Sequence, residues 1–188
     1  FTVDAATVTI RGLVINRFAH DGIRLIDGGG SVIQGNYIGT DPSGLFALPN
    51  GTASTDWGGI GVQNSPNNLI GGTTAELRNV ISGNGGDGIF LSHAGSQGNT
   101  IIGNYVGIDA LGLRSLGNAR GGILMGTSYG SNSYARNNRV GGSTPEERNI
   151  VVGSGVIGMQ SVGQLVGGLG GNDNLIEGNY VGTDPTGS

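Results

Sequence analysis

The sequence predicts an all-β fold in which short strands stack as a solenoid. An asparagine followed by an aromatic residue, Ile or Val, and Gly recurs at 36–39, 104–107 and 179–182. A variant of this phrase, in which an aliphatic residue follows the asparagine, lies between these copies at 79–83 and 149–153. Short β-type segments that return at intervals of tens of residues, each too small to bury its own apolar side, are typical of stacked repeats.

Three sets of aliphatic residues predict three strands in each turn of the solenoid. Side chains alternate across a strand, so an aliphatic residue at a fixed place in every repeat predicts an inward column. The first strand reads Gly-Ile-x-apolar, and its column is Ile23, Ile60, Ile89 and Ile123, with Ile157 of a looser copy at 156–159. The second strand gives the column Ile10, Ile33, Ile70, Ile101, Val140 and Ile176, and the third gives Ile15, Ile38, Ile81, Val106, Val151 and Val181. We therefore expect a closed, roughly triangular tube of five full turns and one partial turn.

We expect the corner between the second and third strands to be built by a structural ladder of asparagines. The residues at this corner are Asn36, Asn79, Asn104, Asn149 and Asn179. Asparagine tolerates the left-handed backbone conformation that a sharp bend needs, and stacked side-chain amides can hydrogen-bond along the pile. The pattern favours this role over ligand binding. Leu13 takes the equivalent place in the first turn, so the ladder is expected to begin one turn later.

These features resemble the right-handed, single-stranded parallel β-helix of the pectin-lyase-like superfamily. The phrases at 178–187, Gly-Asn-Tyr-Val-Gly-Thr-Asp-Pro-Thr-Gly, and at 78–84, Arg-Asn-Val-Ile-Ser-Gly-Asn, are also similar to repeats in very long secreted or surface-attached bacterial proteins. The resemblance covers nearly the whole chain and implies an extracellular or cell-surface location. It singles out no activity, because the superfamily includes lyases, hydrolases, adhesins and phage tailspikes. We expect residues 1–188 to form a single β-helix domain that is a piece of a longer chain.

The loops add two local predictions. A Ser or Thr followed three places later by Glu occurs at 73–76 and 143–146, an arrangement that caps the start of a short helix. Arg78 or Arg148 follows, and the pattern favours local capping and ion pairing there over an Arg-carboxylate site for a partner.

In the other turns, Asp41, Asp109 and Asp184 each open a type I turn in which the carboxylate accepts backbone N–H groups. Because these aspartates recur on every second turn, about 9–10 Å apart, one calcium ion could not bridge them. We expect neither a metal nor a cofactor.

Composition excludes several classes of partner. The net charge is −4, lysine is absent and the nine arginines are scattered, which argues against nucleic-acid binding. No apolar run reaches the ~20 residues that a membrane span requires. Glycine contributes 41 residues without the Gly-X-Y period of collagen, so the glycines are expected in turns.

The outward face of the first strand is where enzymes of the resembling superfamily usually carry their catalytic groups. The predicted outward column there contains no carboxylate and consists of Arg24, Gly61, Phe90, Leu124 and Gly158. If the protein is an enzyme, Asp21, Asp56 and Asp87 are the candidate acids, because Asp21 and Asp87 stand two turns apart with glycine between them. Asp-Gly before a strand is more often a turn. His20 and His93 are not aligned and are expected to be solvated.

Trp57 is the candidate for ligand binding. It is the only tryptophan, and it ends the longest loop, 41–56, which is expected to overhang this face. Its ring could stack on a sugar, with Phe90 extending the platform and Arg24 beside them, or it could pack the loop onto the rod.

These observations leave two main hypotheses for function. The first is a structural, adhesin-like module that presents loops to a glycan or protein partner. The alternative is a polysaccharide lyase or glycoside hydrolase of pectinase type; an ice-binding surface is disfavoured because the outward columns are mixed. Exposed terminal turns carry unpaired backbone groups, so we also expect end-to-end self-stacking.

Overall fold

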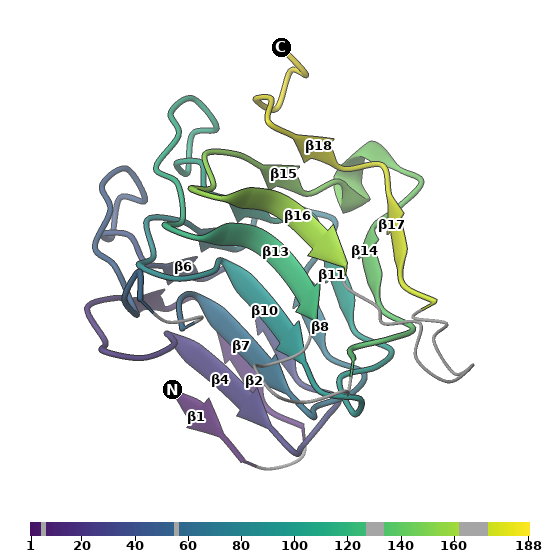
Figure 1. The fold of residues 1–188 in the computed structure, drawn as a ribbon. Coiled ribbons are helices and arrows are strands. Elements are labelled where there is room, and N and C mark those ends of the chain that lie inside the picture. Colours follow the sequence, from purple (N-terminus) through teal and green to yellow (C-terminus); the bar gives the residue numbers. More distant parts are fainter. Residues whose placement is uncertain (5–6, 55–56, 127–133, 162–172) are drawn as a thin grey trace.

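The computed structural model describes residues 1–4, 7–54, 57–126, 134–161 and 173–188. Three parallel sheets of six strands each follow one another around the chain, so that each turn contributes one strand to every sheet (Figure 1). The predicted parallel β-helix with three strands per turn is therefore confirmed. The turn expected to be partial also contributes three strands, which makes six turns.

Sheet A is formed by the first strand of each turn, and its members in spatial order are β1 (Thr2–Val3), β4 (Ile23–Ile26), β7 (Ile60–Gln63), β10 (Ile89–Ser92), β13 (Gly121–Gly126) and β16 (Ile157–Ser161). Sheet B is formed by the second strands, β2 (Thr9–Arg11), β5 (Val32–Gln34), β8 (Leu69–Gly71), β11 (Thr100–Ile102), β14 (Arg139–Gly141) and β17 (Leu175–Glu177). Sheet C is formed by the third strands, β3 (Val14–Ile15), β6 (Tyr37–Ile38), β9 (Val80–Ile81), β12 (Tyr105–Val106), β15 (Ile150–Val151) and β18 (Tyr180–Val181).

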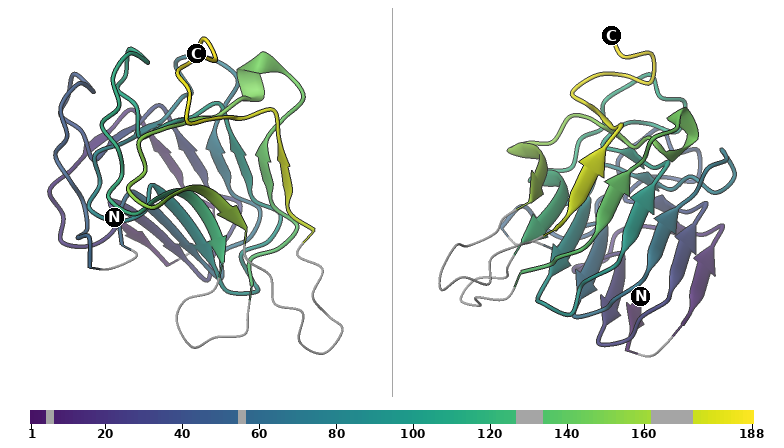
Figure 2. Two further views of the ribbon diagram at one scale, coloured as in Figure 1. Left: turned by 45° about the horizontal axis from the view of Figure 1, so that its top comes forward. Right: turned by 90° about the vertical axis from the view of Figure 1, so that its right-hand side faces the viewer.

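The three sheets enclose one apolar interior (Figure 2). In sheet A, Ile23, Ile60, Ile89 and Ile123 are paired in register from turn to turn, as predicted. The columns predicted for sheets B and C are also in register along their whole length. Their members in the middle turns are almost completely buried. Stability therefore comes from contacts between neighbouring turns.

The predicted alignment of the last turn is wrong by two residues. Met159, not Ile157, pairs with Ile123, and Gln160, not Gly158, continues the outward column after Leu124. A shift of two residues preserves the alternation of inward and outward side chains, so periodicity alone could not detect it.

Asparagine ladders run along all three corners, and only one of them was predicted. Between sheets B and C, each amide Nδ2 donates to the Oδ1 of the next turn at 2.8–3.0 Å, through Asn36, Asn79, Asn104, Asn149 and Asn179. Between sheets A and B the same contact links Asn68, Asn99, Asn138 and Asn174. Between sheets C and A it links Asn50, Asn84 and Asn118. Each ladder joins turns through polar groups that burial would otherwise leave unsatisfied.

The left-handed residue of the predicted corner is not the asparagine. Gly35, Gly103 and Gly178 precede it with φ of 62°, 66° and 65°. A Cβ on Gly103 would lie 1.9 Å from the Gly72 carbonyl oxygen, so glycine fits where the turns approach closely. The asparagine backbone can then stay in an ordinary conformation while its amide points into the ladder.

The predicted short helix exists in one of the two expected places. The 3₁₀ helix η1 (Pro145–Glu147) begins after Thr144, one residue later than expected, and Glu147 accepts a hydrogen bond from the Thr144 N–H at 3.4 Å. Pro145 presets the φ of the first helical residue, whereas Ala75 stands at the matching place in the other loop, which forms only a turn.

Arg78 and Arg148 make equivalent contacts with the following turn. Their guanidinium groups stack over the rings of Tyr105 and Tyr180, with 4.1 and 4.0 Å to the ring centroids. Each Nε also donates to a backbone carbonyl. Both arginines thus bind the turns together locally.

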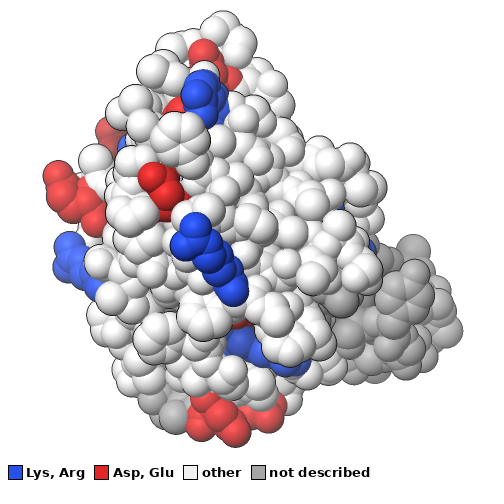
Figure 3. Space-filling view, turned by 90° about the vertical axis from the view of Figure 1, so that its left-hand side faces the viewer, with Lys and Arg blue, Asp and Glu red and all other residues white. Residues whose placement is uncertain are grey.

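The aspartate turns after sheet C have the predicted hydrogen bonds. Gly44 and Gly112 donate their N–H groups to the carbonyls of Asp41 and Asp109, three residues earlier in the chain. The carboxylate of Asp41 accepts the backbone N–H groups of Leu45 and Phe46. The face that carries these loops has only isolated charged side chains (Figure 3). Among the described residues, no helix is long and apolar enough to cross a membrane.

Candidate functional site

A pocket of about 170 Å³ lies on the outer face of sheet A, over β4, β7 and β10. Its walls combine two aromatic rings with charged and polar groups, and they are formed by Asp21, Arg24, Trp57, Gly61, Val62, Gln63, Phe90, Ser92 and His93. Four of the residues singled out from the sequence, Asp21, Arg24, Trp57 and Phe90, therefore meet in one place. We call this group of residues the sheet A pocket.

Asp21 forms the acidic wall of this pocket. Its residue is only 9% exposed, and its Oδ1 accepts the backbone N–H of Gly58 at 2.9 Å. Burial raises the pKa of this carboxyl group, although the Gly58 hydrogen bond and the nearby positive charge of Arg24 act in the opposite direction. The balance means that the surroundings favour the protonated acid more than water does.

Arg24 is held in a fixed place by its neighbours. Its Nη2 donates to Gln63 Oε1 at 2.6 Å, and its Nε lies 3.9 Å from Asp21 Oδ2. The guanidinium is planar and remains partly exposed, so it can still donate to a ligand oxygen from the pocket side. β4 and β7 supply Arg24 and Gln63 from adjacent turns, which is why the pair forms across the sheet.

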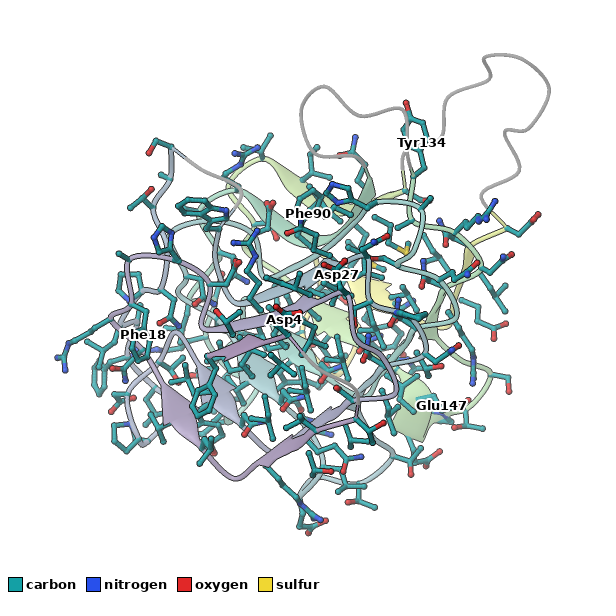
Figure 4. The ribbon with its side chains drawn as sticks, turned by 90° about the horizontal axis from the view of Figure 1, so that it is seen from below. Asp4, Phe18, Asp27, Phe90, Tyr134 and Glu147 are labelled. Carbon is teal, nitrogen blue, oxygen red and sulfur yellow. The ribbon has the colours of Figure 1, made fainter. Side chains whose placement is uncertain are left out.

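Trp57 closes the pocket from the loop that precedes β7. Its ring meets the ring of His20 edge to face, with centroids 4.0 Å apart and an interplanar angle of 70°. The chain returns closely on itself here: a Cβ on Gly51 would lie 1.8 Å from the Trp57 carbonyl oxygen. Phe90 projects from β10 on the same face; Figure 4 views the molecule from the N-terminal end and labels it. The aromatic surface is thus placed by local packing and not by a ligand.

Asp87 lies elsewhere. It is 2% exposed and lines a second pocket of about 110 Å³, together with Arg120, Gly121, Leu124, Val156, Ile157 and Gln160. Asp56 lies outside the described residues. The described acids predicted for catalysis therefore do not converge: Asp21 and Asp87 line different pockets.

Sequence reasoning missed several residues of the sheet A pocket. His93 was expected to be solvated, but it lines the pocket, and His20 supports Trp57 from outside. Gln63 and Ser92 were missed because only one outward position per strand was considered. β4, β7 and β10 are four residues long, so each has a second outward position, and this register pairs Ile26, Gln63 and Ser92.

The arrangement can bind a polar ligand through one fixed cation, a side-chain amide and a hydroxyl, and can place aromatic rings against its apolar faces. In the described ranges, no group of three or more His, Asp or Glu side chains could hold a metal ion.

Comparison with known proteins found no family model, no curated protein and no solved structure that matches the chain. The fold thus stands on the coordinates, while the likeness to the pectin-lyase-like superfamily stays a prediction from motifs.

Proposed function

We propose that this chain is a structural, adhesin-like β-helix module of a secreted or cell-surface bacterial protein, and that it presents the sheet A pocket to a glycan. The observation that carries the proposal is the convergence of Trp57, Phe90 and Arg24 on one outer face of the rod. Aromatic faces and fixed hydrogen-bond donors are the groups that recognise sugar rings and their oxygens.

The rod itself supports the structural part of the proposal. Three amide ladders and three aliphatic columns hold the described turns together through neighbour contacts, which suits a stiff spacer. The pocket takes its residues from β4, β7, β10 and nearby loops, so binding would require no rearrangement of the stack.

A glycan-binding measurement on the intact chain tests the proposal. Trp57→Ala should weaken binding of a recognised oligosaccharide by about tenfold or more, because the loss of a stacked ring removes on the order of 1–2 kcal/mol. Isothermal titration against oligosaccharides first selected on a glycan array would provide the affinities. Phe46→Ala is the matched control, since Phe46 is an exposed aromatic residue on a different loop.

Equal affinities for Trp57→Ala and the unsubstituted chain would contradict the proposal, and so would an equal loss in Phe46→Ala. Because Trp57 packs on His20, a thermal melt should accompany each variant to separate loss of binding from loss of folding.

Polysaccharide cleavage is the second candidate, and the buried carboxyl of Asp21 is the observation that favours it. A general acid needs a raised pKa, which Asp21 has, but a hydrolase also needs a second carboxylate beside the same bond. Asp87 lines a different pocket and so does not supply it. Appearance of reducing ends or of unsaturated products from acidic polysaccharides, lost in Asp21→Asn, would establish cleavage and displace the structural proposal.

A further inference from the structure

Exposed apolar side chains gather at the two ends of the stack. The N-terminal face is made by β1, β2 and β3, and the C-terminal face by β16, β17 and β18. Large exposed apolar residues near the N-terminal face are Phe1, Leu13, Val14 and Phe18, and near the C-terminal face they are Val156, Leu175, Ile176 and Val181. Ile176 and Val181 are 43% and 48% exposed, although the residues of the same columns in the middle turns are fully buried.

The backbone groups on these faces are complementary. In successive turns, the strand that follows donates N–H groups to the carbonyls of the strand before it, as Tyr180 does to Asn149 and Gly182 does to Val151. In the last described turn, the carbonyls at the same places belong to Asn179 and Val181. In the first turn, the N–H groups at the matching donor places, those in register with Tyr37 and Gly39, belong to Val14 and Asn16. One face thus presents acceptors at the spacing at which the other presents donors.

The register also places opposite charges together. The outer position at the end of each sheet B strand is occupied in turn by Arg11, Gln34, Gly71, Ile102, Gly141 and Glu177. If a further turn with the sequence of β2 followed β17, Arg11 would stand opposite Glu177. Opposite charges directly across a strand pair stabilise it, whereas like charges destabilise it.

We propose that the C-terminal face binds the N-terminal face of a second copy of this chain, which continues the stack head to tail. In that junction the column that ends at Ile176 continues with Ile10, and the column that ends at Val181 continues with Ile15. The contact joins two different surfaces, so it leaves a free face at each end and builds open filaments instead of closed dimers.

The junction is weaker than the contacts inside one chain. Within the stack, the N–H of each ladder asparagine donates to the Oδ1 of the next turn, as Asn149 does to Asn179. A second copy offers Leu13 opposite Asn179 and Val8 opposite Asn174, and neither side chain has an acceptor. Two of the three amide ladders therefore stop at the junction, and assembly should be reversible and depend on concentration.

Sedimentation velocity over a wide range of concentration tests this. The unsubstituted chain should form a ladder of oligomers that grows with concentration. Leu13→Glu on the N-terminal face and Ile176→Lys on the C-terminal face should each weaken self-association by about tenfold or more, because each would place a charge in an apolar contact. Leu113→Lys is the matched control, since Leu113 is an exposed apolar residue on a side loop, and it should assemble like the unsubstituted chain.

A mixing experiment identifies the geometry. The Leu13→Glu chain keeps its C-terminal face and the Ile176→Lys chain keeps its N-terminal face, so a mixture of the two should give a one-to-one dimer and nothing larger. Circular dichroism of each variant ensures that both are folded. A dimer formed by either variant alone would overturn the proposal, because it would require two identical faces to meet, and so would a monomeric unsubstituted chain at every concentration.

The charge pair provides a test of register. Arg11→Glu should weaken assembly by about twofold to fivefold, as expected for like charges across a strand pair, and Glu177→Arg should act similarly. The double variant should restore assembly, which a purely structural role for either residue would not do. Failure of the double variant to recover would overturn the register. The proposal is independent of glycan binding, so Trp57→Ala should leave assembly unchanged.

Discussion

Asp21 is the residue on which the surroundings have the clearest electrostatic effect. Burial raises its pKa, while the Gly58 N–H and Arg24 oppose that change. A carboxyl group whose pKa is higher in the folded than in the unfolded chain binds more protons when folded. Its contribution to stability is therefore most favourable below the ordinary value of 3.8 and is lost as the pH rises through the folded pKa.

Asp21→Asn should remove this dependence. Asparagine keeps an oxygen that can accept the Gly58 N–H but does not ionise, so the variant should gain stability relative to the unsubstituted chain as the pH rises above 3.8. Denaturant unfolding of both chains at several pH values measures the difference, in which the other carboxylates cancel. If that difference fell with rising pH, Arg24 and Gly58 would outweigh burial, contrary to expectation.

At this scale, sequence reasoning found candidate residues but not all of their partners. Trp57, Phe90, Arg24 and Asp21 could be selected because each is an unusual residue type at its place in the repeat. Their convergence depends on the path of the 41–56 loop, which no periodicity encodes. His93 turns toward the pocket from a left-handed position with φ of 70°, a conformation rarely expected for histidine.

Among the structural elements, the corner ladders decide how the turns align. Asn104 is completely buried; its Nδ2 donates to the carbonyls of Ile70 and Ile102 as well as to Asn149 Oδ1, and its Oδ1 accepts from Asn79. Few residues in the chain satisfy so many buried groups at once.

Asn104→Ala should lower the free energy of unfolding by about 2–4 kcal/mol, because it leaves buried donors and acceptors of two neighbouring turns without partners. Asn179→Ala should cost clearly less, since Asn179 lies at the end of the ladder, where it is only partly buried. Urea unfolding monitored by circular dichroism gives both values. Equal losses at the two positions would show that burial in the ladder does not set the cost.

The same ladders explain the one error in the predicted register. Asn118 in the fifth turn is bridged to Ser154 in the sixth, and this pairing brings Met159 opposite Ile123. The aliphatic pattern alone allowed Ile157 at that place. Serine in an asparagine column concealed the corner, so the sequence offered no amide by which to align the last turn.

The fold of the whole molecule was predictable because the same short pattern is repeated in every turn. Three aliphatic columns, each kept in register, specify a tube without any knowledge of the loops. The loops that shape the sheet A pocket occur once each, and a feature present once gives no internal comparison.

Stability should vary along the rod in a defined way. Ile10 and Ile15 are 4% and 3% exposed in the first turn, whereas Ile176 and Val181 in the last are far more exposed. Hydrogen exchange followed by mass spectrometry should find the slowest amides in β7–β12 and the fastest strand amides in β16–β18, with β2 and β3 between them. Uniform protection along the rod would indicate a single cooperative unit instead of turns coupled to their neighbours.

The amide ladders also have a direction. Every linking Nδ2 donates toward the C-terminal end, so a turn that has just formed carries donors that only the following turn can satisfy. As the chain leaves the ribosome, the latest winding is thus a template for the next one, and the rod can grow in the order in which it is synthesised.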